Sequence, residues 1–485
     1  MIQTECLFDC EPVPHDCAPV AYTPKEDVPY TLRHGDCLEV LKGMEAETYT
    51  AIVTDPPAGI AFMGKQWDKD KGGRKQWIAW MAEVAAECLR VCKPGAHALV
   101  WALPRTSHWT ATAWEDAGWE VRDRVAFAFG SGFPKSQAIG KALDKKAGAE
   151  REVVGVTRKG LMPGKSTYSG VDKKIVPADI TVPATDDAKT WEGYGTALKP
   201  SVEDWWILRK PISEKSIAEN CVKHGCGALN IDGSRVGTDT RINQRSNVGV
   251  YHGGGRDLEN LKKWMDKRTP QNVSGRWPAH LVHDGSPEVL AEFGKAGVSK
   301  STPFHKHAMA DIRGGDLCNS IGKPYVPCDK QVNYSDEGSP ARFFASCPAE
   351  SGDYPPFLYG AKAGRKEKEK GLEGEETGTA GRGTSRKCLS CGKLIITSSD
   401  PCTCENRIEQ STQTTNGHPT VKSLSLMRWL CGLVKMPGYN KVLDCFAGTG
   451  TTLIAAGQLG MEADGIEQEE EYVRIGRLRL KAASS

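Results

Sequence analysis

Residues 441–467 read KVLDCFAGTGTTLIAAGQLGMEADGIE, and this stretch decides the fold. The apolar residues at its start predict a strand over 441–445, which leads into a glycine-rich turn. The next apolar run has the length and spacing of a helix over 452–459, and Gly460 ends it. A second strand is expected over 461–467. A strand, a helix and a second strand in this order are typical of an α/β protein with a parallel sheet.

The turn between the first strand and the helix is a candidate ligand site. Gly448 and Gly450 let the backbone turn sharply and approach a ligand without a clash from a Cβ atom. Glu467 ends the second strand, where an acidic side chain can accept hydrogen bonds from both hydroxyls of a ribose. The spacing resembles that of a dinucleotide site, but the third glycine of that motif is absent. Taken alone, the segment fits either a cofactor loop or an ordinary turn between a strand and a helix.

A second α/β stretch lies near the N-terminus. Apolar and β-branched residues predict a strand over 49–54, and residues 77–91 carry apolar side chains at helical spacing. Residues 93–95 (KPG) are expected to end that helix, and further strands are expected over 98–101 and 204–208. Helices that alternate with short apolar strands indicate a parallel sheet covered by helices on both faces.

The strand over 49–54 leads directly into the tetrapeptide Asp55-Pro56-Pro57-Ala58. Ligands of an open parallel sheet bind beyond the carboxyl ends of its strands, so Asp55 is expected to face the site. Two consecutive prolines fix the backbone and remove two N–H donors, which leaves the Pro56 carbonyl free. A carboxylate beside that carbonyl offers two acceptors to one exocyclic NH2 group and can stabilise positive charge that grows on its nitrogen. The alternative is a simple Asp-Pro turn after a strand.

Composition narrows the class of protein and its compartment. The chain has 485 residues, of which 39% are hydrophobic and 26% charged, so we expect a soluble protein with two or three domains. Its net charge of +2 neither indicates nor excludes nucleic acid as a partner. We find no apolar run of membrane-spanning length and no signal peptide. The 17 cysteines favour a reducing, intracellular compartment over a disulfide framework, because their number is odd and many lie in apolar segments.

Together the two segments resemble those of the DNA amino-methyltransferases, which act on exocyclic nitrogens of adenine or cytosine. That family carries a D/N/S-P-P-aromatic tetrapeptide and an F-x-G-x-G cofactor loop. Here the tetrapeptide precedes the loop, an order that resembles the permuted β class, in which the target-recognition region lies between them. Residues 418–422 (HPTVK) resemble the H-P-T-x-K-P element of that class, with Ser423 in place of the last proline, and Gly35-Asp36 resembles its acidic turn. Several further stretches are similar to phage and prophage members.

The resemblance implies an α/β fold of the Rossmann-like, S-adenosylmethionine-dependent methyltransferase type, circularly permuted, with an inserted target-recognition region. It implies S-adenosylmethionine as cofactor and double-stranded DNA as partner. The target base would have to leave the duplex, because the cofactor cannot reach a base inside the stack. The implied catalytic residues are Asp55, Pro56, Pro57 and Ala58. The implied cofactor-binding residues are Asp36, His418, Thr420, Lys422, Asp444, Phe446, Gly448, Gly450, Thr451 and Glu467.

One position departs from the family pattern. Ala58 stands where the family has an aromatic residue that stacks on the extruded base, an interaction worth roughly 1–3 kcal/mol. Either Phe62 or Trp67 supplies this stack, or catalysis is weaker than usual. The bland alternative is a homologue that binds DNA and has lost its activity. Asp55 favours N6 of adenine as the target, because an acidic first residue resembles the adenine enzymes more often, and N4 of cytosine is the alternative.

Composition shifts along the chain predict how its parts are divided. We expect an N-terminal arm over 1–28, a catalytic half over 29–212, a target-recognition region over 213–350, a linker over 351–416 and a cofactor-binding half over 417–485. The charge run over 361–386 within the linker is expected to be solvated.

Four cysteines in that linker predict a metal site. Cys388 and Cys391 form a C-x-x-C pair, and Cys402 and Cys404 form a tighter C-x-C pair. Two close pairs of thiolates match a structural zinc ion, so we expect a small zinc-knuckle-like insert over 388–404. Such a zinc would not be catalytic, because four protein ligands leave no open position. Free thiols in a flexible linker are the alternative.

The sequence therefore predicts a site-specific DNA methyltransferase in the cytoplasm of a bacterial or phage-infected cell. No membrane partner is expected, and both a monomer and a dimer remain open. Methylation of RNA or of a protein glutamine is a rival function, since related tetrapeptides serve those substrates. The long insert between the two motifs favours DNA over both.

Overall fold

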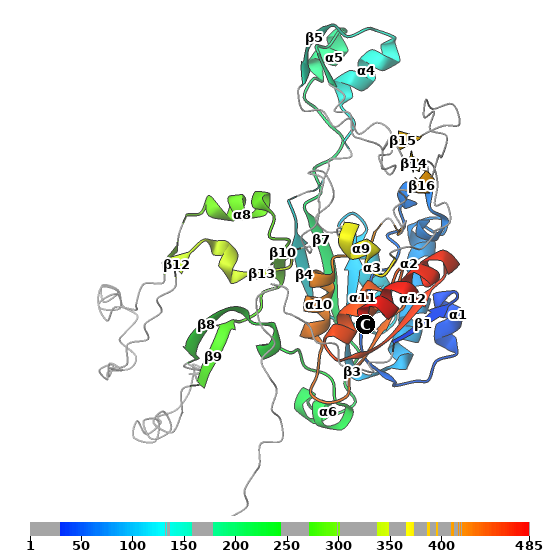
Figure 1. The fold of residues 1–485 in the computed structure, drawn as a ribbon, viewed down its shortest axis with the longest axis vertical. Coiled ribbons are helices and arrows are strands. Elements are labelled where there is room, and N and C mark those ends of the chain that lie inside the picture. Colours follow the sequence, from blue (N-terminus) through cyan, green and yellow to red (C-terminus); the bar gives the residue numbers. More distant parts are fainter. Residues whose placement is uncertain are drawn as a thin grey trace, which may run out of the picture.

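The computed structural model describes residues 30–130, 132, 136–157, 178–243, 271–297, 299–300, 337–348, 365–372, 386–388, 394–395, 409–411, 416, 418 and 420–484. Its centre is a nine-stranded sheet in the order β1-β18-β17-β2-β3-β7-β4-β10-β13 (Figure 1). These strands are β1 Tyr30–His34, β2 Tyr49–Thr54, β3 Cys92–Ala102, β4 Glu120–Ala128, β7 Val202–Arg209, β10 Leu281–His283, β13 Ala345–Ser346, β17 Lys441–Asp444 and β18 Glu462–Glu467.

Strands from the two ends of the described chain lie side by side in this sheet. β17 pairs with β2, with Val442 opposite Ala51, and β18 pairs with β1. Side chains join the halves as well, because the Thr54 hydroxyl donates to Asp444 Oδ1 over 2.7 Å. The two segments that carry the sequence motifs, far apart along the chain, therefore belong to one sheet.

The expected parallel sheet is in fact mixed. β1, β18, β17, β2 and β3 run parallel, and β10 and β13 run parallel to β4, but β7 is antiparallel to both β3 and β4. The chain leaves β4 at the carboxyl edge of the sheet, passes through an insert and re-enters at the same edge. β7 must then run backward, so its first residues lie beside the carboxyl end of β3, where Ala102 faces Asp204.

Helices cover both faces of the sheet, as expected. On one face lie α1 Cys37–Lys42, α2 Arg74–Val91 and α3 Ser107–Asp116, and on the other lie α10 Leu424–Leu433, α11 Thr451–Gln458 and α12 Glu470–Ser484. Alternation along β2 explains the two cores: Ala51 and Val53 pack with the α10–α12 side, and Ile52 packs with the α1–α3 side. β3 starts earlier than expected, at Cys92, because that residue continues the pairing with Tyr49.

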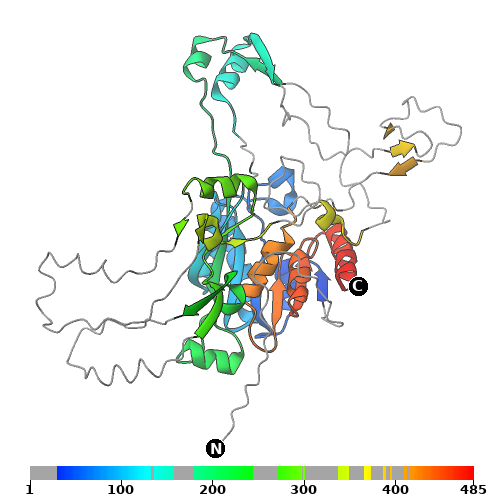
Figure 2. The same ribbon diagram turned by 60° about the vertical axis from the view of Figure 1, so that its left-hand side comes forward.

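The insert between β4 and β7 forms a separate small unit. It contains α4 Ile139–Ala147, β5 Val153–Thr157, β6 Ala178–Thr181 and α5 Asp186–Thr190. Both views show these elements standing away from the sheet (Figures 1 and 2). A buried carboxylate holds the unit together, because Asp144 pairs with Arg151 at 2.8 Å and accepts the backbone N–H of Thr185 at 2.9 Å.

The predicted recognition region contributes to the main sheet through β10 and β13. Its other described helices and strands are α6 Ile217–His224, β8 Val236–Asn243, β9 Gln271–Arg276, α8 Pro287–Gly294, β11 Ser299–Lys300 and β12 Glu337–Gly338. Elsewhere in the described chain lie β14 Arg386–Cys388, β15 Leu394–Ile395 and β16 Glu409–Ser411, and four short 3-10 turns occur at Phe62–Gly64, Gln66–Asp68, Asp232–Ser234 and Pro340–Phe343.

The charge run expected to be solvated is packed over part of its length. Residues 365–372 include α9 Arg365–Glu369, and the Glu367 carboxylate accepts the backbone N–H of Leu424 at the start of α10. Leu372 is buried as well. This part of the run is therefore fixed to the C-terminal half, because an acidic side chain satisfies a free N–H at a helix start.

The predicted zinc site lies largely outside the described residues. Cys388 ends β14, and Cys391, Cys402 and Cys404 lie outside the described residues. Among the side chains that the structure does describe, no group of three potential metal ligands occurs. None of the described helices is long and apolar enough to cross a membrane.

Candidate active site

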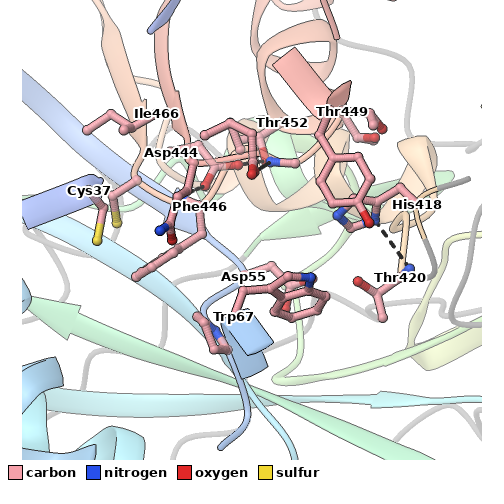
Figure 3. A pocket seen from close by; sticks show the side chains of 18 of the residues that line it. Cys37, Asp55, Trp67, His418, Thr420, Asp444, Phe446, Thr449, Thr452 and Ile466 are labelled. Carbon is pink, nitrogen blue, oxygen red and sulfur yellow. Dashed lines mark hydrogen bonds between the residues drawn. The ribbon is translucent and has the colours of Figure 1, made fainter. Parts of the chain in front are cut away.

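One pocket opens where the carboxyl ends of β1, β2, β17 and β18 meet, and Figure 3 shows its side chains. Both motifs reach it. Of the predicted site residues, those that line it are Asp36, Asp55, Pro57, Trp67, His418, Thr420, Lys422, Asp444, Phe446, Gly448, Thr451 and Glu467. Four others lie close by without lining it: Pro56, Ala58, Phe62 and Gly450.

The glycine loop after β17 needs its glycines. Gly448 and Gly450 have φ angles of +52° and +80°, which side chains rarely tolerate. A Cβ on Gly448 would lie 3.0 Å from His418 Nε2. The Gly448 N–H donates to Glu467 Oε2 over 2.8 Å, so the loop and the acid at the end of β18 are held together.

Asp444 joins the loop to the N-terminal half. It is almost fully buried, and its carboxylate accepts hydrogen bonds from the hydroxyls of Thr54 and Thr452 and from the N–H of Phe446. Burial raises the pKa of Asp444, and these three donors oppose the rise. Asp444 thus fixes the turn with groups from both halves of the chain.

Three of the predicted cofactor-binding residues make hydrogen bonds within the protein. Burial raises the pKa of Glu467 to about 7, against the effect of the Glu469 and Gly448 N–H groups that its carboxylate accepts. Asp36 caps α1 by accepting the N–H of Leu38. Thr451 accepts a hydrogen bond from the guanidinium of Arg479.

Arg479 supports the glycine loop from behind. This buried side chain on α12 donates to the Thr449 carbonyl over 2.7 Å and to the Thr449 hydroxyl over 2.8 Å. Sequence reasoning did not single it out, because an arginine in a terminal amphipathic helix is usually a surface residue.

Aromatic rings form one wall of the pocket. The Trp67 and His418 rings are nearly parallel, with centroids 6.4 Å apart, and His418 packs edge-on against Tyr472 at 4.4 Å. Trp80 packs against Phe446 at 6.1 Å. Of the two predicted stacking residues, Trp67 is therefore the one that lines the pocket (Figure 3).

Asp68 folds the loop that follows the tetrapeptide, and sequence reasoning missed it. Its buried carboxylate accepts the N–H groups of Ala58 at 2.6 Å, Gly59 at 3.1 Å and Phe62 at 2.7 Å. Three backbone donors on one carboxylate fix the chain from Ala58 onward and place the neighbouring Trp67 at the pocket.

Asp55 lies in the pocket beside two charged groups. Lys422 Nζ is 3.3 Å from Asp55 Oδ2 and also 3.3 Å from Glu203 Oε2. Burial raises the pKa of Asp55 to about 7, Glu203 and Asp444 add to the rise, and Lys422 opposes it. Lys422, which was predicted to bind the cofactor, lines the pocket, and its ammonium group forms an ion pair with Asp55. The Asp55 side chain stays 21% exposed, so a ligand can still reach it.

Comparison with known proteins identifies the family of the chain. The family model of the N6/N4 DNA methylases matches residues 49–477, from β2 into α12, so the chain belongs to the N6/N4 DNA methylase family.

Individual relatives match over short segments. The type II methyltransferase M.BamHI of Bacillus amyloliquefaciens is 32% identical over 77 residues, 15% of this chain and 18% of that protein. The type II methyltransferase M2.DpnII of Streptococcus pneumoniae is 42% identical over 66 residues, 13% of this chain and 24% of that protein. The chain thus matches less than a quarter of the length of either relative. The solved structure of the cytosine-N4-specific PvuII DNA methyltransferase has a TM-score of 0.38 and 11% identity, over 95% of this chain and 88% of that one.

Proposed function

We propose that the chain transfers a methyl group from S-adenosylmethionine to an exocyclic amino group of a base in duplex DNA, with N6 of adenine as the favoured target. The observation that carries this proposal is that Asp55 and the glycine loop at Gly448 line one pocket. Membership of the N6/N4 DNA methylase family supports the same reaction class. We place the reaction in the cytoplasm, where bacterial or phage DNA lies.

The pocket fits S-adenosylmethionine. The loop at Gly448 leaves no room for a Cβ beside His418, which is expected where a backbone approaches a ligand closely. The Glu467 carboxylate can accept ribose hydroxyls, and the rings of Phe446 and Trp80 offer apolar faces to a heterocycle. When bound, the cofactor supplies an electrophilic methyl group on a sulfonium centre.

The protein's own groups would orient the acceptor nitrogen. Asp55 can accept one N–H of the target amino group, and the Pro56 carbonyl is our candidate for accepting the other. Holding both hydrogens aims the nitrogen lone pair and stabilises the positive charge that grows on nitrogen. Trp67 is our candidate for stacking on the extruded base in place of an aromatic residue at Ala58.

Label transfer from tritiated S-adenosylmethionine to duplex DNA of mixed sequence tests the proposal. Hydrolysis of the labelled DNA to nucleosides should give labelled N6-methyldeoxyadenosine, and labelled N4-methyldeoxycytidine would establish the alternative target. Asp55→Ala should abolish transfer and leave cofactor affinity within a few-fold. DNA binding without any transfer by the wild-type chain would instead establish the inactive homologue that Ala58 suggests. Label in RNA or peptide but not in DNA would overturn the choice of substrate.

Two expectations from the sequence extend this proposal. We infer that residues 213–350 read the target sequence and that Cys388, Cys391, Cys402 and Cys404 hold a structural zinc ion. Metal analysis of the purified chain should give one zinc per chain, and Cys391→Ser should lose it. A wild-type chain without zinc would contradict the metal site.

A further inference from the structure

Glu203 is an acidic residue of the pocket region that neither sequence motif marks. We propose that Glu203 is a positioning residue of the reaction, which acts through Lys422 to set the orientation and the charge of Asp55. The inference rests on the methyl transfer proposed above and adds a second acidic residue to its machinery.

The contacts form a chain that ends at Asp55. Trp101 Nε1 donates to Glu203 Oε2 over 2.8 Å, and the same oxygen lies 3.3 Å from Lys422 Nζ. Lys422 Nζ is in turn 3.3 Å from Asp55 Oδ2 and 3.9 Å from the centre of the Trp101 ring. One ammonium group therefore bridges two carboxylates above an indole face.

Burial fixes the position of the Lys422 ammonium group between the two carboxylates. The side chains of Lys422 and Glu203 are only 8% and 10% exposed, whereas that of Asp55 is 21% exposed. A buried charge without a partner costs several kcal/mol, so Lys422 needs its anions and its position is determined by them. Glu203 is fixed by Trp101 and holds the ammonium group of Lys422. Because Lys422 contacts Asp55 at Oδ2, Oδ1 is the oxygen that we expect to accept the incoming amino group.

The strand direction explains how Glu203 reaches the site. β7 is antiparallel to β3, and Trp101 near the end of β3 faces Trp205 near the start of β7. The first residues of β7 therefore lie at the edge of the sheet where Asp55 follows β2. Because β7 is antiparallel, Glu203 near its start lies at the edge of the sheet where the parallel strands end.

Within the described part of the chain, the charges that act on Asp55 are those of Lys422, Glu203 and Asp444. Asp55 must be ionised to accept the amino group, so transfer should fall as the pH drops through the pKa of Asp55. Removing the negative charge of Glu203 makes the Asp55 anion easier to form, whereas removing the positive charge of Lys422 makes it harder to form. The two substitutions must therefore act in opposite directions.

Single-turnover methyl transfer to DNA across pH 5 to 9 (roughly the range that brackets a carboxyl raised by burial) tests this. Glu203→Gln should move the acid limb down by about one pH unit, and Lys422→Met should move it up by about one unit. Lys422→Arg keeps the charge and should keep the limb in place. Glu120→Gln is the matched control and should leave the acid limb unmoved. Glu120 Oε2 pairs with Arg209 Nη2 over 2.6 Å, and Arg209 lies at the far end of β7 from Glu203.

A second readout needs neither cofactor nor activity. The titration of Asp55 can be followed by 13C NMR of aspartate-labelled chain, with Asp55→Asn to assign the signal. The midpoint should shift down in Glu203→Gln and up in Lys422→Met.

The outcomes separate the possible failures. If Glu203→Gln lowers transfer equally at every pH and leaves both the limb and the NMR midpoint in place, Glu203 only stabilises the fold and the inference is overturned. If Lys422→Met does not fold, the result with Glu203→Gln alone still tests the inference. If the wild-type chain transfers no methyl group at any pH, the proposed function fails, and the NMR midpoints still decide the role of Glu203.

Discussion

Replacing Asp68 with alanine removes the three hydrogen bonds that fold the loop after the tetrapeptide. The Gly59 N–H is buried, and leaving it without its acceptor costs about 1–3 kcal/mol. The N–H groups of Ala58 and Phe62 are only partly buried, so water can replace much of what they lose. We therefore expect Asp68→Ala to destabilise the folded loop by about 3 kcal/mol.

A loss of this size raises the population of the open loop by about 100-fold. Limited digestion with trypsin measures it, because Lys65 and Lys69 lie within the loop and become cleavable when it opens. Methyl transfer should also fall more than tenfold, since Trp67 then leaves the pocket wall. Asp70→Ala is the control in the same loop, because Asp70 accepts one exposed N–H, that of Gly72. Cleavage and transfer by Asp68→Ala at the rates of Asp70→Ala would refute the role assigned to Asp68.

Two further predictions concern the cofactor side of the pocket. Gly448→Ala should weaken binding of S-adenosylmethionine at least tenfold by calorimetry, because the new methyl group would lie 3.0 Å from His418. Gly460→Ala is the control and should bind normally, because Gly460 has a similarly strained φ of +71° but a Cβ there would meet nothing within 4 Å. Equal losses of affinity in both variants would show that backbone strain alone is responsible. Affinity for S-adenosylmethionine should rise as the pH increases through about 7, because Glu467 then ionises and becomes a better hydrogen-bond acceptor. The affinity of Glu467→Gln should not change with pH over the same range. An affinity of the wild-type chain that is independent of pH would contradict this prediction.

Much of the fold follows from local sequence pattern. β2 begins and ends at the predicted residues, and β17 and β18 differ from expectation by one residue each. These strands are short, apolar and bounded by turn residues, which is the pattern that sequence reasoning reads best. The acids Asp55 and Glu467 were found because each one follows or ends such a strand.

The residues that sequence reasoning missed act through tertiary contacts. Glu203 lies at the start of a strand, and only the antiparallel direction of β7 brings it to the site. Asp68 lies in a run of Lys and Asp that looks solvated, yet three backbone N–H groups draw its carboxylate inside. Lys422 itself was found by motif, but its ion pairs with Asp55 and Glu203 are tertiary contacts that a motif does not predict. A signal for Asp68 was available, since an acid within a glycine-containing turn often binds nearby N–H groups.

The position of β17 and β18 between β1 and β2 in the sheet has a consequence for biosynthesis. During translation β2 emerges with the edge that will receive β17 still open, and β1 emerges before β18, its partner among the described strands. The nascent chain therefore carries unpaired strand edges until residues 441–467, which contain β17 and β18, have been made. Such edges invite association with other chains, so this protein should depend on chaperones and slow, late closure of its sheet more than one built in sequence order.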